Sequence, residues 1–297
     1  MQVLGLCRFS YPAQGGFQTE HESIEERIRF LYADDRLNER FRIFESFTLP
    51  ALQAQTDPDF TLIVVIGADM PAAPRARLEG LLAGLPQALV RVMEPGRHRS
   101  VMGQIINEAR RDDGQPCIQF RMDDDDAVAC DFVAKTREVA AGSAALIDRH
   151  RLTAIDFTRG HIAQPTARGI LAEPTARQYW VPSLSVVARP GEALTVMNFN
   201  HVKLWQFMPT ITLKDPDMYV RGISNWNDSG VRSSAQAALL DEPGEALFRI
   251  ADLSTVWVLA EVYEQDIARV RPGQPATVRL DAWPGEDFAA TVDYLYP

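Results

Sequence analysis

Four consecutive aspartates at positions 123–126, called here the aspartate cluster, are the group best suited to chemistry in this chain of 297 residues. They follow the apolar segment 117–122, which predicts a buried strand ending in carboxylates. Adjacent like charges repel one another, and burying them without a counter-charge is costly. Oxygen ligands alone suit a hard divalent ion such as Mg²⁺ or Mn²⁺. The cluster therefore predicts a metal site, with a solvated acidic turn as the alternative.

Alternating strand and helix patterns predict the frame that positions these aspartates. The expected strands cover 2–9, 60–66, 89–93 and 118–122, and the expected helices cover 22–32, 37–55, 74–83, 101–111 and 131 to about 146. Pro50 should bend or interrupt the second helix. The alternation predicts an α/β fold with a mostly parallel sheet, which binds ligands at the carboxyl ends of its strands. Short stretches at 154–158, 169–171, 180–188 and 210–213 predict a smaller, partly antiparallel subdomain.

Composition narrows the class of protein. A net charge of −10 argues against a broad basic surface for nucleic acid. Three cysteines without metal-site spacing favour a reduced, cytoplasmic compartment. The N-terminus lacks the pattern of a signal peptide, and no apolar run approaches the roughly 18 residues of a membrane span. We therefore expect a cytoplasmic protein without a membrane span.

The last fifty or so residues differ from the rest of the chain. Residues 245–297 contain nine acidic residues, four arginines and no lysine. The stretch 256–262 is strongly apolar, and 276–283 alternates apolar with polar side chains. This pattern predicts a small C-terminal all-β segment.

The surroundings of the aspartate cluster resemble a known family. Residues 122–126 followed by Asp131-Phe132-Val133 resemble the DxD signature of GT-A nucleotide-sugar glycosyltransferases. The segments 46–57, 60–66 and 104–109 are similar to a helix end, the second strand and the helix before the DxD strand of these enzymes. More narrowly, 5–10 and 225–230 resemble a rhamnosyltransferase family, and the whole likeness covers roughly residues 1–235. It implies a GT-A (Rossmann-like) fold and metal-dependent sugar transfer, with rhamnose as a candidate, from a nucleotide-sugar donor to a hydroxyl of a glycan or other acceptor.

The resemblance also implies roles for the cluster. Asp123 and Asp125 fill the DxD positions, so that Asp123 faces the nucleotide and both lie at the metal, Mn²⁺ or Mg²⁺, that neutralises the diphosphate. Asp124 should point away because side chains alternate along extended backbone. His201 is a further candidate metal ligand or diphosphate contact, with a packed or surface histidine as the alternative.

Five further residues are candidates for binding the nucleotide sugar. Arg8, at the end of the first strand, is expected at the base or diphosphate, or else is a surface arginine. Asp69 follows the second strand and suits the nucleobase or ribose, or a strand-end cap. Arg97 and Arg99 precede a helix and suit a diphosphate clamp, or a loop that is basic for solubility. Asn107 lies near the asparagine usual in the family.

The candidate catalytic residue is Asp228. An inverting transfer needs one carboxylate within reach of the acceptor hydroxyl. Asp228 lies in a segment rich in asparagine and glycine, so a turn or a helix cap is the alternative. Asp156 and Glu173 are the reserve candidates.

The C-terminal segment resembles a different family. The stretches 247–258, 270–276, 282–285 and 294–297 are similar to the β-barrel region of periplasmic adaptor subunits of tripartite metal-efflux pumps. We interpret the chain as a glycosyltransferase domain, 1–240, joined to an adaptor-like fragment, 245–297, by natural fusion, frameshift or engineering. The rival function is a non-enzymatic adaptor, which draws only on this segment.

Overall fold

The computed structural model describes residues 1–15, 21–111, 113–166, 169–224, 238–239, 269–279 and 288–292. The chain divides into two compact units, Met1–Asp252 and Leu253–Pro297. The first unit contains the aspartate cluster, and the second contains the described part of the C-terminal segment.

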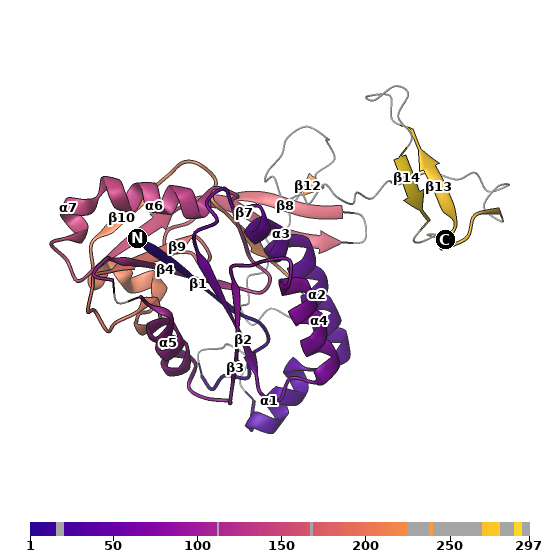
Figure 1. Cartoon of the computed structure of the whole chain (residues 1–297), viewed down its shortest axis with the longest axis horizontal. Coiled ribbons are helices and arrows are strands. Elements are labelled where there is room, and N and C mark those ends of the chain that lie inside the picture. Colours follow the sequence, from indigo (N-terminus) through magenta and orange to yellow (C-terminus); the bar gives the residue numbers. More distant parts are fainter. Residues whose placement is uncertain are drawn as a thin grey trace. The chain divides into compact units, whose positions relative to one another are not determined.

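A seven-stranded sheet in the order β10-β6-β9-β4-β1-β2-β3 forms the centre of the first unit (Figure 1). Neighbouring strands run parallel, except that β9 is antiparallel to both β4 and β6. The mostly parallel sheet predicted from the sequence is therefore confirmed. The strands are β1 (Gln2–Arg8), β2 (Thr61–Gly67), β3 (Ala88–Met93), β4 (Cys117–Asp123), β6 (Leu152–Phe157), β9 (Leu184–Ala188) and β10 (Thr210–Leu213).

Helices pack on both faces of this sheet (Figure 1). Met102, Ile105 and Ile106 of α5 pack with Leu4 and Leu6 on one face. Apolar residues of α2, α3, α4 and α6 join the core on the other face. The helices are α1 (Ile24–Leu31), α2 (Asp34–Ile43), α3 (Leu49–Gln53), α4 (Ala72–Leu82), α5 (His98–Ala109), α6 (Phe132–Gly142) and α7 (Ala144–Ile147), with 3-10 helices η2 (Val196–Asn198) and η3 (His201–Gln206).

A π-helical segment, η1 (Phe44–Thr48), joins α2 to α3. The N–H of Leu49 donates to the carbonyl of Phe44, five residues earlier. Pro50 follows directly and has no N–H to donate to the preceding turn. The wider turn accommodates the proline, so the interruption expected at Pro50 takes the form of a π segment rather than a break.

A second, five-stranded sheet lies in the order β12-β8-β7-β11-β5. β7 and β8 are antiparallel, and β8 includes the predicted stretch 169–171. The other three stretches predicted for a separate subdomain, 154–158, 180–188 and 210–213, instead lie in the central sheet as β6, β9 and β10, because β9 pairs with both β4 and β6. β5 directly follows the aspartate cluster and pairs with β11, so this sheet brings a late part of the chain to the cluster. Its strands are β5 (Ala127–Val128), β7 (Arg159–Thr166), β8 (Gly169–Ala176), β11 (Tyr219–Gly222) and β12 (Ala238–Leu239).

The described part of the second unit contains an antiparallel pair, β13 (Pro275–Val278) and β14 (Phe288–Thr291). β13 covers the first part of the stretch 276–283, in which the alternation of side chains predicts a strand. The strand expected at 256–262 lies outside the described residues. Among the helices that the structure describes, none has the length and apolar character needed to cross a membrane.

Candidate active site

The aspartate cluster lies at the carboxyl edge of the central sheet. β4 ends at Asp123, which is in register with Arg8 at the end of β1. The next three aspartates form the turn into β5, and they are 3%, 3% and 0% exposed. The N–H of Asp126 donates to the carbonyl of Asp123 at 3.2 Å, and the N–H of Asp123 donates to Oδ2 of Asp126 at 3.2 Å. The alternative of a solvated acidic turn is therefore wrong.

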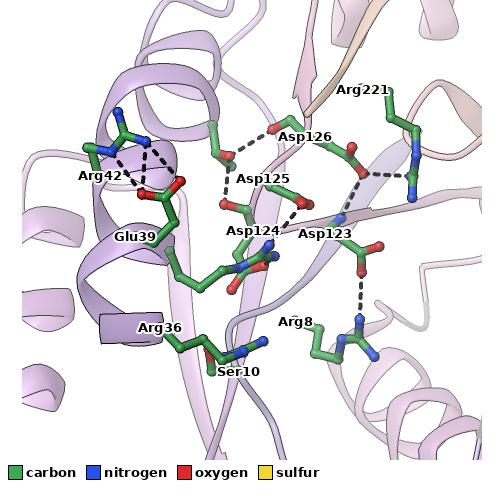
Figure 2. Close-up of polar contacts among 12 residues, drawn as sticks. Arg8, Ser10, Arg36, Glu39, Arg42, Asp123, Asp124, Asp125, Asp126 and Arg221 are labelled. Carbon is green, nitrogen blue, oxygen red and sulfur yellow. Dashed lines mark hydrogen bonds and ion pairs between the residues drawn. The ribbon is translucent and has the colours of Figure 1, made fainter. Parts of the chain in front are cut away.

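Arginines from three distant elements neutralise the cluster, as Figure 2 shows for Arg8 and Arg221. Arg8 of β1 lies 3.1 Å from Asp123, and Arg221 of β11 lies 3.5 Å from Asp126. Arg40 of α2 pairs with Asp124 and lies 2.9 Å from Asp125. The sequence predicts a metal ion as the counter-charge and does not point to Arg40 or Arg221. The available signal was in α2, where Arg36 and Arg40 share the helical spacing of the buried side chains.

Backbone contacts fix the turn that carries the aspartates. The hydroxyl of Thr48, at the end of η1, donates to the carbonyl of Asp126 at 2.8 Å and to that of Asp124 at 3.2 Å. Gly222, at the end of β11, passes so close that a Cβ there would overlap the carbonyl oxygen of Asp125. Glycine is required at this position by the close approach of two backbones.

The arginines set the pKa values of the cluster. Burial alone raises the pKa of Asp123, but Arg8, Arg221, Arg40 and Arg121 outweigh burial and lower it to about 2. Burial raises the pKa of Asp126 well above its usual value, and Arg221 opposes this shift only in part. Asp123 is therefore an anion at neutral pH, and its side chain is also the most exposed of the four, at 34%.

Three of the four carboxylates could hold a divalent cation. Asp123, Asp125 and Asp126 each offer one oxygen, and these oxygens lie within 4.8 Å of one another. Oδ1 of Asp126 is buried and has no hydrogen-bond partner among the described residues. An oxygen-only donor set with an unpartnered buried oxygen fits Mg²⁺ or Mn²⁺. Asp124 is outside this group, although it shares the guanidinium of Arg40 with Asp125.

Cationic and imidazole side chains surround Asp123 on one face of the sheet. Arg121 lies two residues before Asp123 on β4, and burial lowers its pKa to about 10. Burial and the neighbouring charges of Arg8 and Arg121 lower the pKa of His98 to about 3. Burial also lowers the pKa of His201, which responds to the charges of Arg121 and Asp123. The sequence does not point to Arg121, whereas His98 lies within the segment 97–99 that it predicts as a diphosphate clamp. A face that combines arginine forks with a carboxylate suits a phosphate group and its counter-ion.

Comparison with known proteins identifies the family. The model of the family described as "Putative rhamnosyl transferase" matches residues 2–236. The chain belongs to this family. The model of a CusB-like β-barrel domain matches residues 255–297, so both resemblances seen in the sequence are confirmed. No curated protein sequence matches the chain.

The solved structures that this chain resembles include those of S. aureus TarS, residues 1–349. The complex with UDP has a TM-score of 0.41 at 12% identity and covers 75% of this chain and 61% of that chain. The complex with UDP-GlcNAc has a TM-score of 0.40 at 13% identity and covers 77% and 60%. This chain thus spans about three fifths of the length of these TarS structures.

The rhamnosyl transferase family match contains every site residue proposed from the sequence. Asp69 lies exposed in the turn after β2, and Arg97 and Arg99 lie exposed at the start of α5, all at the carboxyl edge of the sheet. His201 begins η3, with its Nδ1 2.6 Å from the carbonyl of Tyr179. Asp228 lies outside the described residues.

Asn107 lies apart from the other candidates. It is near the C-terminal end of α5, where its side chain donates to the carbonyl of Ala193 at 2.9 Å. The same helix end receives a hydrogen bond from Gln2, which begins β1, whereas Arg8 ends that strand. The six residue-to-residue steps from Gln2 to Arg8 span about 20 Å. The structure therefore does not bring Asn107 to the aspartate cluster.

Proposed function

We propose that residues 2–236 transfer a sugar, with rhamnose as the first candidate, from a nucleotide-sugar donor to a hydroxyl of a glycan or other acceptor. The observation that carries the proposal is the pairing of carboxylates with arginines at the carboxyl edge of the sheet, within a chain that belongs to the rhamnosyl transferase family. Ligands bind at this edge in open α/β sheets.

The donor diphosphate would lie against the face formed by Arg8, Arg121 and His98. Arg8 and Arg121 can donate to phosphate oxygens, while Asp123 is anionic and partly exposed beside them. Asp123, Asp125 and Asp126 would hold a divalent cation, Mn²⁺ or Mg²⁺. His201 is outside this group of three carboxylates, and it remains a proposed further ligand because the charge of Asp123 acts on its imidazole. When bound, that cation supplies Lewis-acid assistance to the departing phosphate.

The chemical step is attack by the acceptor oxygen on the anomeric carbon. The new carbon–oxygen bond forms as the bond from that carbon to the phosphate oxygen breaks, and the nucleoside diphosphate leaves with the electron pair. Asp228 is the proposed base that takes the hydroxyl proton. Asp156 is a reserve candidate, although its carboxylate is 0% exposed and one oxygen accepts the N–H of Tyr179.

The CusB-like match at residues 255–297 favours a second candidate function, that of a non-enzymatic efflux-pump adaptor. This candidate draws only on the second unit and leaves the charged edge of the central sheet unexplained. We therefore assign enzymatic activity to the first unit and propose no function for the second.

Thermal unfolding with a panel of nucleoside diphosphates, each with and without Mn²⁺, tests the proposal. A ligand that binds the native state at about 100 times its Kd adds about 2.7 kcal/mol to the free energy of unfolding. We expect one nucleotide to raise the Tm in the presence of Mn²⁺, and Asp123→Asn to remove the shift. Asp148→Asn, at an exposed position after α7, is the matched control and should keep the shift. No response to any nucleotide would favour the adaptor.

A further inference from the structure

Asp156 is a buried carboxylate that the proposed reaction does not use directly. It lies near the end of β6, is 0% exposed and faces the same side of the sheet as Ala154 and Leu184. Its Oδ1 accepts the N–H of Tyr179 at 2.9 Å, and its Oδ2 has no hydrogen-bond partner among the described residues. A buried carboxylate with one partner is costly, so its position calls for a reason.

Register places Asp156 beside the proposed phosphate site. Asp156 pairs with Leu184 of β9, and the next residue, Ser185, pairs with Phe120 of β4. Continuing that register by one residue sets Leu184 opposite Arg121, on the face that also carries Asp123. Two strand spacings, about 10 Å, therefore separate the backbones of Asp156 and Arg121.

Tyr179 joins Asp156 to His201 through its own peptide groups. Its φ of 60° lies in the left-handed region, which is strained for a residue other than glycine. The N–H of Tyr179 donates to Asp156, and its carbonyl oxygen lies 2.6 Å from Nδ1 of His201. The two hydrogen bonds hold this residue from both sides, in a conformation that the chain alone would disfavour.

The second hydrogen bond fixes the chemistry of the imidazole. A carbonyl oxygen only accepts, so Nδ1 of His201 must carry the proton. In the neutral ring, the lone pair is then on Nε2. Histidines that bind metals commonly donate their other N–H to a backbone carbonyl, which sets both the tautomer and the ring orientation. His201 has this arrangement, and its pKa is lowered by burial and responds to the charges of Arg121, Arg221 and Asp123.

We propose that Asp156 is a positioning residue that acts through the Tyr179 peptide to fix His201 with Nδ1 protonated and the Nε2 lone pair presented to the site of Asp123 and Arg121. The relay needs an acceptor oxygen at position 156 and the backbone, not the side chain, of residue 179. The partner of Nε2, a divalent cation or a hydroxyl of the nucleotide sugar, rests on the proposed function. The state of the imidazole does not rest on it.

Nitrogen-15 NMR of histidine-labelled, ligand-free full-length protein at pH 7.5 tests the relay, with the His201 signals assigned by their loss in His201→Gln. In the wild type we expect Nδ1 to have the shift of a protonated nitrogen and Nε2 that of a bare one. A protonated Nε2 or an even mixture of tautomers in the wild type would overturn the proposal without any variant.

Two substitutions at position 156 then isolate the acceptor. Asp156→Asn keeps an oxygen for the Tyr179 N–H and should preserve the wild-type shifts. Asp156→Leu has a side chain of similar size without a hydrogen-bond acceptor, and it should move the shifts of both His201 nitrogens toward the average of the two tautomers. If the leucine variant does not fold, Asp156→Ala takes its place. Unchanged shifts in a folded acceptor-free variant, or equal changes in Asp156→Asn, would contradict the relay.

Tyr179→Gly is the matched control for the intermediate residue. Glycine keeps the N–H and the carbonyl and adopts a positive φ without strain, so the His201 shifts should stay as in the wild type. Loss of the Nδ1-protonated tautomer of His201 in this variant would mean that the tyrosine ring, and not the peptide group, positions the imidazole. No nucleotide or metal is added in these NMR experiments. A result that contradicts the relay therefore does not bear on the proposed glycosyl transfer, which the thermal unfolding experiment tests separately.

Discussion

The guanidinium of Arg40 lies 2.9 Å from the carboxylate of Asp125, and the two side chains are only 6% and 4% exposed. Asp125 is therefore both a candidate metal ligand and half of a buried ion pair. Removing one partner of such a pair leaves the other charge buried and uncompensated. Variants at this site consequently need separate measurements of stability and of binding.

Arg40→Met should destabilise the protein by about 3–5 kcal/mol, because it leaves two buried carboxylates without their shared cation. Urea unfolding measures the change. If the cluster binds divalent ions, Mn²⁺ should raise the Tm of this variant more than that of the wild type. Arg42→Met is the matched control on the same helix, since its pair with Glu39 is exposed and worth about 0–1 kcal/mol. Equal losses in the two variants would remove Arg40 from the role of internal counter-charge.

Asp125→Asn should abolish metal-dependent nucleotide binding, because it removes a charge and an oxygen ligand from the group of three carboxylates. Calorimetric titration of the nucleotide that gives the largest thermal shift, in Mn²⁺, decides the point. Asp124→Asn is a sharp comparison, since Asp124 also pairs with Arg40 but is outside that group. It should lose stability and keep the binding. Wild-type affinity in Asp125→Asn would exclude Asp125 from the site.

The stability of the protein should depend on the ionisation of Asp156. Burial raises its pKa from 3.8 to about 6, so the folded state binds this proton more tightly than the unfolded state does. The contribution of Asp156 to the free energy of unfolding therefore falls as the pH rises from 3.8 to about 6, and it stays constant at higher pH. Asp156→Asn cannot ionise. Its stability relative to the wild type should increase by about 2–3 kcal/mol between pH 4 and pH 7. A difference independent of pH, by urea unfolding, would contradict the raised pKa.

Local patterns were enough to predict the sheet and the place of the cluster in it. The unbroken apolar run before Asp123 identifies a buried strand, and the alternation of elements makes that strand parallel to its neighbours. The helical spacing in α2 indicates that Arg40 is buried, but the pairing of Arg40 and Arg221 with the cluster could not be predicted, because 85 and 95 residues separate the partners. Pairing at that range depends on the tertiary fold and not on any local pattern.

The second sheet likewise could not be predicted from local sequence patterns alone. β7 contains Arg159, His161 and Pro165, which lack the apolar alternation of a strand, and its neighbours β8 and β11 supply the pairing. Asn107 was proposed from its place in a family pattern, yet the end of α5 carries it to the opposite end of the sheet.

Asp228→Asn separates binding from chemistry. If Asp228 is the base, the variant should bind the donor nucleotide like the wild type, while turnover falls by roughly 10²-fold or more, the scale of a positioned acid–base group. The two measurements are nucleotide titration and a transfer assay with the identified donor. Near-normal turnover would direct the search for the base to Asp156 or Glu173.

A chain that ends at residue 240 should keep nucleotide binding and most of its Tm. All the proposed site residues precede that point, the rhamnosyl transferase family match ends at residue 236, and the cut preserves β12, whose Ala238 and Leu239 pair with β8. The removed part lacks lysine and includes the CusB-like match, as expected for a segment that did not evolve against this core.

The comparison is the Tm of the truncated and full-length chains, each with and without the nucleotide and Mn²⁺. For a domain of this size, 1 kcal/mol corresponds to roughly 2–4 °C. A larger fall, or loss of the folded state, would mean that the C-terminal segment stabilises the enzyme domain. The interpretation as two joined pieces would then give way to one in which residues beyond 240 complete the sheet of the enzyme.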